Sequence, residues 1–312
     1  MIKKLVVALL ILAMMSAMLV SCDLSGFETL VDSYGDADAE ETVSKGEDES
    51  SSKNDKVVEQ LNGMTPYEVY SEFSEKLVQL SSNCTIIATS DVNSVINVSG
   101  QSFVSTTNIE MIGKTCGDNS YSKTTTLTSI SGAGSTTTVM ETWYVDGVLY
   151  MINDQGDGNV QKLKMTITKE QANTVVYGDK EEGEGTIIDI PESWFNDVSF
   201  EKQKDGNYIM NIDMSGSRMA QAIQRLGITT GELEISDIHY AFKVDKEGMI
   251  LSSTGDYTMS LGGEEGGANY SASAEGAMET KYSDFGTTKD IEVPEGADSY
   301  VEVTYDEIFG NL

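Results

Sequence analysis

Residues 142–151 read TWYVDGVLYM, and no other segment predicts one local structure so strongly. Asp146-Gly147 is a dipeptide preferred in type I′ turns, and apolar residues flank it on both sides. Such a turn sets Trp143 opposite Tyr150 and Tyr144 opposite Leu149. Both faces of this hairpin are therefore apolar, so we expect one face to pack on helices and the other to line a groove or meet another layer.

The segments on either side of this hairpin also predict antiparallel strands. Residues 84–98 alternate between apolar and polar side chains, and a turn at 99–100 sets Ile96 opposite Phe103. Residues 238–276 form a predicted meander, in which a loop over 262–267 sets Leu261 opposite Ala268 and Tyr257 opposite Ala272. Small side chains on the last strand leave room over the sheet, which either a helix or an acyl chain would fill.

Three helices are expected among the strands. The first begins at Thr65-Pro66, where Thr65 and Glu68 have the spacing of a capping box, and it ends near residues 81–83. Shorter helices are expected over residues 168–177 and 215–226. The fold class that follows is mainly β: a strongly curved antiparallel sheet, or open half-barrel, with a few helices over its concave face.

The N-terminus has the features of a lipoprotein signal. Lys3 and Lys4 precede an apolar run over residues 5–20, which ends in the lipobox Leu19-Val-Ser-Cys22. We expect removal of residues 1–21 and attachment of a diacylglycerol to Cys22, whose two acyl chains give stable anchoring in a membrane. An ordinary signal peptide or an uncleaved anchor are the alternatives.

Domain boundaries and location follow from this N-terminus. Residues 22–62 carry the lipidated cysteine and an acidic, Ser-rich tether, and residues 63–312 form a single domain. The protein is expected at the outer, extracytoplasmic face of a bacterial cell membrane. Asp23 resembles a signal for retention at the inner membrane if the cell has two membranes.

Composition excludes several classes of function. The net charge of −31 argues against nucleic-acid binding and against a polybasic grip on lipid headgroups. One His and three Cys do not make the usual zinc sites, and no phosphate loop, dinucleotide fingerprint or nucleophile elbow is present. We therefore expect no enzyme activity, no cofactor and no metal.

Two cysteines remain after lipidation, Cys84 and Cys116. The turn at 99–100 sets Cys84 opposite residue 115, one residue short of Cys116, and a bulge near Gly113 would bring the two together. An exported chain meets oxidising conditions, so a disulfide is the first hypothesis. Two separate thiols are the alternative.

The order of lipobox, acidic tether, helix and long amphipathic strands resembles the LolA/LppX-like (LppX/LprG-type) bacterial lipoproteins. The hairpin at 142–151 and the tail YSDFGTTKDIEVPEGA at 282–297 carry the resemblance, which covers roughly residues 64–303. It implies a half-barrel with an apolar cavity for lipid or acyl chains and no catalytic residues. Long loops and extreme acidity are departures from that family.

The expected function is a lipid-anchored, non-catalytic binding protein with a cavity for a lipid-like ligand. The alternative is a surface interaction lipoprotein whose acidic surface binds a cationic partner or a cell-wall component; neither reading identifies a protein partner. The residues expected to line the cavity are Met140, Trp143, Tyr144, Leu149, Met151, Tyr270, Ala272, Ala274 and Gly276.

Overall fold

One large sheet organises the chain in this computed structural model, which describes residues 60–80, 82–98, 101–168, 171, 194–225, 232–265 and 268–309. Its spatial order is β13-β6-β5-β4-β3-β2-β1-β12-β11-β10-β8-β7, and β9 also pairs with β11. The strands are β1 (Asn83–Val98), β2 (Gln101–Cys116), β3 (Asn119–Ile130), β4 (Gly134–Val145), β5 (Val148–Asp154), β6 (Val160–Thr166), β7 (Phe195–Lys202), β8 (Tyr208–Met214), β9 (Glu232–Ile235), β10 (Ile238–Val244), β11 (Ile250–Glu265), β12 (Ala268–Ser283) and β13 (Val301–Glu302).

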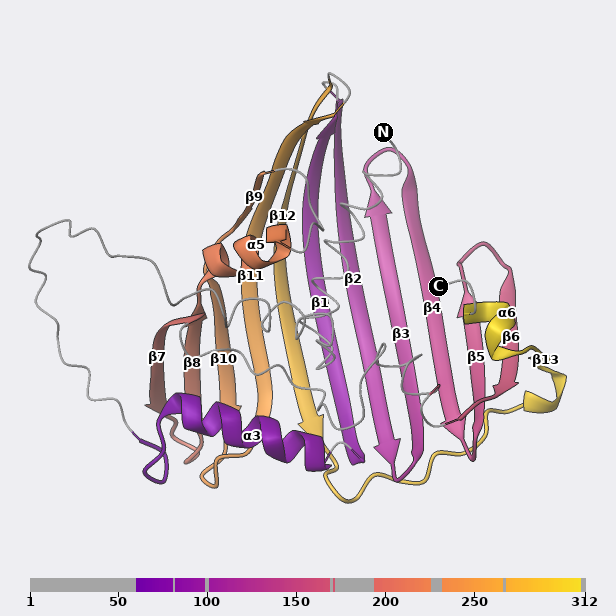
Figure 1. Cartoon of the computed structure of the whole chain (residues 1–312), viewed down its shortest axis with the longest axis horizontal. Coiled ribbons are helices and arrows are strands. Elements are labelled where there is room, and N and C mark those ends of the chain that lie inside the picture. Colours follow the sequence, from indigo (N-terminus) through magenta and orange to yellow (C-terminus); the bar gives the residue numbers. More distant parts are fainter. Residues whose placement is uncertain are drawn as a thin grey trace, which may run out of the picture.

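The sheet is open and curved (Figure 1). Neighbouring strands are antiparallel, except that β13 lies parallel to β6. The outermost strands, β7 and β13, do not pair with each other in the described part of the chain. The expected fold class, a mainly β open sheet with a few helices, is confirmed.

The face of the sheet that carries the helices is called here the inner face, and the opposite one the outer face. Successive side chains of a strand alternate between these faces. On β1 the even-numbered residues from Cys84 to Ile96 point inward, and most are buried. The main apolar core lies between the inner faces of β1, β12, β11, β10 and β8 and the two helices α3 and α5.

Helix α3 (Pro66–Leu80) crosses the lower ends of the strands in Figure 1. Its predicted capping box is confirmed: the Glu68 N–H donates to Thr65 Oγ1 at 3.3 Å, and the Thr65 N–H donates to Glu68 Oε2 at 2.7 Å. Val69 and Phe73 bury its apolar side in the main core.

Helix α5 (Gly216–Arg225) packs close to the end of β9. A β-carbon on Gly216 would lie 1.9 Å from the carbonyl oxygen of Ser236, so only glycine fits at the first helical position. Met219 is 1 % exposed and joins the core below the helix. Of the helix expected over 168–177, only Thr168 and Gln171 lie among the described residues, and they form the reciprocal hydrogen bonds of a cap.

Residues 284–309, called here the C-terminal segment, pass from one face of the sheet to the other. The N–H groups of Gly286 and Thr288 donate to Asn83 at the end of β1, and Tyr300 packs on the outer face against Tyr150. β13 then pairs with the edge of β6, and α6 (Tyr305–Phe309) follows on the inner side.

Two hairpin registers are confirmed, and the register of the β11–β12 hairpin is corrected. Trp143 pairs with Tyr150, and Ile96 with Phe103, as the two-residue turns predict. The loop expected over 262–267 is shorter, because β11 runs to Glu265 and β12 starts at Ala268. Tyr257 therefore pairs with Gly276 instead of Ala272, a shift of four residues that keeps both on the inner face.

Candidate ligand-binding face

The inner face carries two separate apolar clusters. The main core lies under α3 and α5, and a smaller cluster of Tyr144, Leu149, Met165 and Ile167 lies at β4–β6. The small cluster is covered by Val303 and Tyr305 of the C-terminal segment. The inner faces of β2, β3 and the upper part of β4 separate the two clusters.

The stretch that separates the two clusters carries both polar and apolar side chains on its inner face. Inner-facing hydroxyls pair across the strands, with Ser122 and Thr142 2.6 Å apart. Three inner-facing apolar side chains are exposed: Phe103 at 41 %, Ile130 at 39 % and Met140 at 47 %. In Figure 1 no helix of the described chain lies over β2 and β3. Among the described residues, this stretch is therefore the part of the inner face without a covering helix.

Two tyrosines lie flat on the inner face of the main core. A β-carbon on Gly276 would lie 2.3 Å from the ring of Tyr257, and one on Gly255 would lie 2.9 Å from the ring of Tyr240. Each ring thus occupies the space above a glycine on the next strand. Burial raises the pKa of Tyr257 to about 12, so its hydroxyl stays protonated and remains a hydrogen-bond donor.

The structure separates the nine residues predicted to line a cavity. Eight share the inner face, whereas Trp143 lies on the outer face beside Tyr121, with ring centroids 5.2 Å apart. Grouping Trp143 with the other eight was wrong, because adjacent residues of a strand point to opposite faces. Tyr144 and Leu149 are buried in the small cluster, and Met151 is half-buried against it.

The remaining predicted residues lie on β12: Tyr270, Ala272, Ala274 and Gly276. β12 is four strands from β4, about 19 Å at the usual strand spacing. The two groups therefore do not form one compact pocket. The space expected over Gly276 is filled by the ring of Tyr257.

Cys84 and Cys116 are not joined by a disulfide. The register is continuous without a bulge at Gly113, so Cys84 pairs with Thr115 and Cys116 pairs with Asn83. The two thiols consequently point to opposite faces, and the predicted disulfide was wrong. Cys116 instead donates to the carbonyl oxygen of Thr288 at 3.6 Å, which ties β2 to the C-terminal segment.

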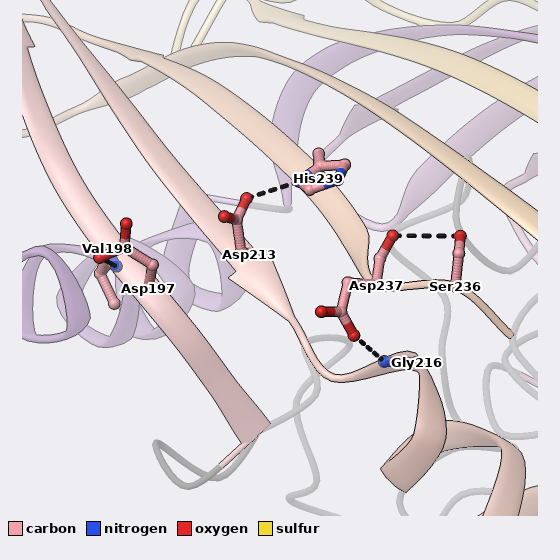
Figure 2. Close-up of polar contacts among 7 residues, drawn as sticks. All are labelled: Asp197, Val198, Asp213, Gly216, Ser236, Asp237 and His239. Carbon is pink, nitrogen blue, oxygen red and sulfur yellow. Dashed lines mark hydrogen bonds and ion pairs between the residues drawn. The ribbon is translucent and has the colours of Figure 1, made fainter. Parts of the chain in front are cut away.

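The outer face of β8 and β10 holds a small polar network around the histidine of the chain (Figure 2). His239 Nδ1 lies 2.6 Å from Asp213 Oδ1, and Asp237 accepts a hydrogen bond from the N–H of Gly216. The hydrogen bond to Asp213 raises the pKa of His239, and the charge of Asp256 adds to it. Ser236, also drawn, is not bonded to this pair: its hydroxyl donates to the carbonyl oxygen of Asp237 at 3.2 Å.

Two further observations concern metal binding and membrane-spanning helices. Within the described ranges, no three His, Cys, Asp or Glu side chains lie close enough to hold a metal ion. None of the helices in the same ranges is long and apolar enough to cross a membrane. Cys22, the predicted lipidation site, lies outside the described residues.

Sequence reasoning missed two buried hydroxyls on the inner face. Tyr257 and Ser90 are each 2 % exposed, and neither hydroxyl has a hydrogen-bond partner among the described residues. The alternation of β1 and β11 places both residues on the inner face. The absence of partners depends on the packing of other strands and helices, and no sequence pattern signals it.

The fold and the inner face define a class: an open, curved antiparallel sheet with helices over one half of one face. Within that class, the chain belongs to DUF6612, a family of unknown function, whose match spans residues 65–300.

Comparison with curated proteins found no match. Among solved structures, a DUF1329 family protein from Desulfovibrio piger ATCC 29098 is similar at 12 % identity and a TM-score of 0.23. That match covers 74 % of this chain and 95 % of the other.

Proposed function

We propose that the chain is a lipid-anchored, extracytoplasmic and non-catalytic binding protein that holds a lipid-like ligand or acyl chain against the inner face of its sheet. The proposal includes a relationship to the LolA/LppX-like lipoproteins, for which the lipobox, the tether and the order of elements are the support. Binding would be partition of apolar surface from water, without a chemical step.

The exposed apolar residues between the two inner-face clusters carry this proposal. Phe103 and Ile130 are diagonal neighbours on β2 and β3, and Met140 lies opposite Thr124, further along the strands toward the small cluster. Each methylene of an acyl chain that leaves water contributes about 0.8 kcal/mol. Hydroxyls that pair with one another, such as Ser94 and Ser105 at 2.6 Å, add little cost to an apolar ligand lying beside them.

Adjacent residues of β2 provide a matched test. Phe103 and Val104 are similarly exposed but point to opposite faces. A charge at the inner position should weaken binding of a pyrene-labelled acyl methyl ester at least tenfold, and Val104→Glu should leave it unchanged. Fluorescence titration measures the affinity, and thermal melts show that both variants fold. Equal binding by Phe103→Glu and the unchanged chain would refute the inner-face site.

The anchor is tested separately. Cys22→Ala should move the protein from the detergent phase to the aqueous phase in detergent phase partitioning, because the diacylglycerol no longer attaches. Metabolic labelling with a fatty acid gives a second readout. Unchanged labelling of the variant would show that Cys22 is not the lipidated residue.

The outer face favours a second candidate function, an interaction surface for a cationic partner or cell-wall component. Asp197, Asp213, His239 and Asp256 form one row across four strands, and Asp91 continues it on β1. Native mass spectrometry after gentle purification separates the two candidates. Co-purifying lipid supports the inner-face function, whereas a clean mass of the protein alone favours the outer-face one.

A further inference from the structure

We propose that the hydroxyls of Tyr257 and Ser90 form the polar end of the binding site and hold the ester carbonyl of a neutral acyl lipid. This inference rests on the proposed function and adds the chemical class of the ligand. Both hydroxyls are buried on the inner face and lack partners among the described residues.

The strand register brings the two hydroxyls to one place. Tyr257 pairs with Gly276, which in turn pairs with Val92 of β1. The ring of Tyr257 reaches across Gly276, and its hydroxyl would lie 2.6 Å from a β-carbon at that position. Ser90 is two residues from Val92, so it is a diagonal neighbour of Gly276, about 7–8 Å away between Cα atoms. Both donors therefore lie in the neighbourhood of Gly276, where a carbonyl and its ester oxygen would accept from them.

Ser90 also links this position to the open stretch of the face. It pairs with Ile109 of β2, and Ile109 lies on the inner face one strand from β3. The distance from β1 to β3 is about 10 Å. An acyl chain lying over β2 and β3 therefore places its polar end at Ser90 and Tyr257 without crossing a charged group.

Leaving both hydroxyls unpaired is costly for the protein alone. A buried donor without a partner loses its hydrogen bonds to water and gains none in return. Elsewhere on the same strand this cost is avoided, since Ser94 bonds to Ser105 at 2.6 Å. The proposed ligand would supply to both donors the partner that the described residues do not supply.

The surroundings select a neutral ligand. No charged side chain stands at the inner-facing positions of β1 from Cys84 to Ile96, of β11 from Ser253 to Leu261, or of β12 from Ala272 to Thr280. A carboxylate buried there would have no counter-charge and would bind poorly. An ester carbonyl accepts hydrogen bonds without charge, so the site fits an acyl ester better than an ionised fatty acid.

Titration of the full chain with three pyrene-labelled probes tests the inference: an acyl methyl ester, the hydrocarbon of equal length and the free acid at pH 7.5. We expect the ester to bind most tightly. Tyr257→Phe and Ser90→Ala should each weaken ester binding about three- to tenfold and leave hydrocarbon binding unchanged. Tyr300→Phe, a buried tyrosine on the outer face, is the control and should bind the ester normally.

A melt of the ligand-free protein gives an independent readout. Because their hydroxyls have no partner to lose, Tyr257→Phe and Ser90→Ala should melt at or above the temperature of the unchanged chain. Ser94→Ala should melt lower, because it leaves Ser105 unpaired.

The possible outcomes separate this inference from the proposed function. Failure of both the ester and the hydrocarbon to bind would overturn the proposed function and the inference with it. Equal loss of ester and hydrocarbon binding, or no loss in either variant, would overturn the inference alone. A crystal structure with ordered waters bonded to both hydroxyls in the presence of bound ester would also overturn it, since water would then be their partner.

Discussion

His239 is the residue whose ionisation the structure controls most clearly by a specific contact. It stands on the outer face of β10 between Asp213 and Asp256, its register partners on β8 and β11. The Asp213 hydrogen bond raises the pKa of His239, partial burial opposes it, and the charges of Asp213, Asp256 and Asp237 raise the pKa further. The protonated form is therefore favoured in the folded state.

This shift predicts a pH dependence of stability. A pKa raised on folding gives stability that is fully present below the unfolded value of about 6.5 and is lost as pH rises through the folded value. His239→Gln should therefore lower the free energy of unfolding at pH 5.5 by about 0.2–1 kcal/mol, the range of exposed ion pairs, and have less effect at pH 8.5. Urea unfolding at both pH values measures the difference.

An NMR titration of the single histidine provides the check. Asp213→Asn should move the midpoint of His239 to lower pH, because the principal contact is lost. An unchanged midpoint in that variant would mean that Asp213 does not hold the proton.

At the scale of elements, glycines inside strands have two different roles. Gly276 makes room for the ring of Tyr257, whereas Gly113 on β2 has nothing within 4 Å of where a β-carbon would be. Gly276→Ala should destabilise the protein by about 1–3 kcal/mol, because the buried ring must move. Gly113→Ala should be neutral or stabilising by up to about 1 kcal/mol, since alanine restricts the unfolded chain.

Urea midpoints of the two glycine variants provide the measurement. Both residues face inward on central strands, so backbone propensity affects them alike. If Gly276→Ala were as stable as Gly113→Ala, the close packing of Tyr257 on β12 would be disproved.

The different roles of glycine, in turns and in packing, explain which strand registers could be predicted from the sequence. Two-residue turns at 99–100 and 146–147 define registers directly, and both registers were right. The pairs of glycines at 262–263 and 266–267 suggested a six-residue loop, but Gly262 and Gly263 belong to β11. A β-carbon on Gly263 would lie 2.5 Å from the hydroxyl of Tyr270, so this glycine serves packing and not a turn.

For the candidate site, the sequence could predict only which residues share a face of the sheet. Alternation along the strands identified eight inner-facing residues. It could not show that the ring of Tyr257 covers Gly276 or that Leu149 is closed over by the C-terminal segment. The cover over Leu149 comes from a segment more than 150 residues further along the chain, and the position of the Tyr257 ring over Gly276 depends on side-chain packing; short-range patterns carry no information about either contact.

At the scale of the whole molecule, the C-terminal segment holds one side of the sheet. Tyr300 is 4 % exposed and packs on Tyr150, whereas its neighbour Val301 is 60 % exposed. Tyr300→Ala should cost about 3 kcal/mol, and Val301→Ala less than about 0.5 kcal/mol. Hydrogen exchange should rise in β5 and β6 of the first variant. Equal stability of the two variants would show that the segment does not support this edge.

Net charge predicts a second property of the whole molecule. At −31 the folded chain repels itself, and salt screens that repulsion over a Debye length that falls from about 30 Å at 0.01 M to about 3 Å at 1 M. Adding NaCl over this range at pH 7.5 should raise the melting temperature by several degrees. Near pH 4, where carboxylates are partly neutralised, the same addition should have a smaller effect.

The open sheet has a consequence for how copies of the protein behave at high local concentration. The edge strand β7 presents backbone donors and acceptors that no described strand uses, and such an edge is a template for fibril growth. Asp197, Glu201 and Lys202 are exposed on β7, and charges along an edge oppose the stacking of identical strands. At high concentration, the charged residues of one short strand thus oppose amyloid-like stacking of copies along this edge.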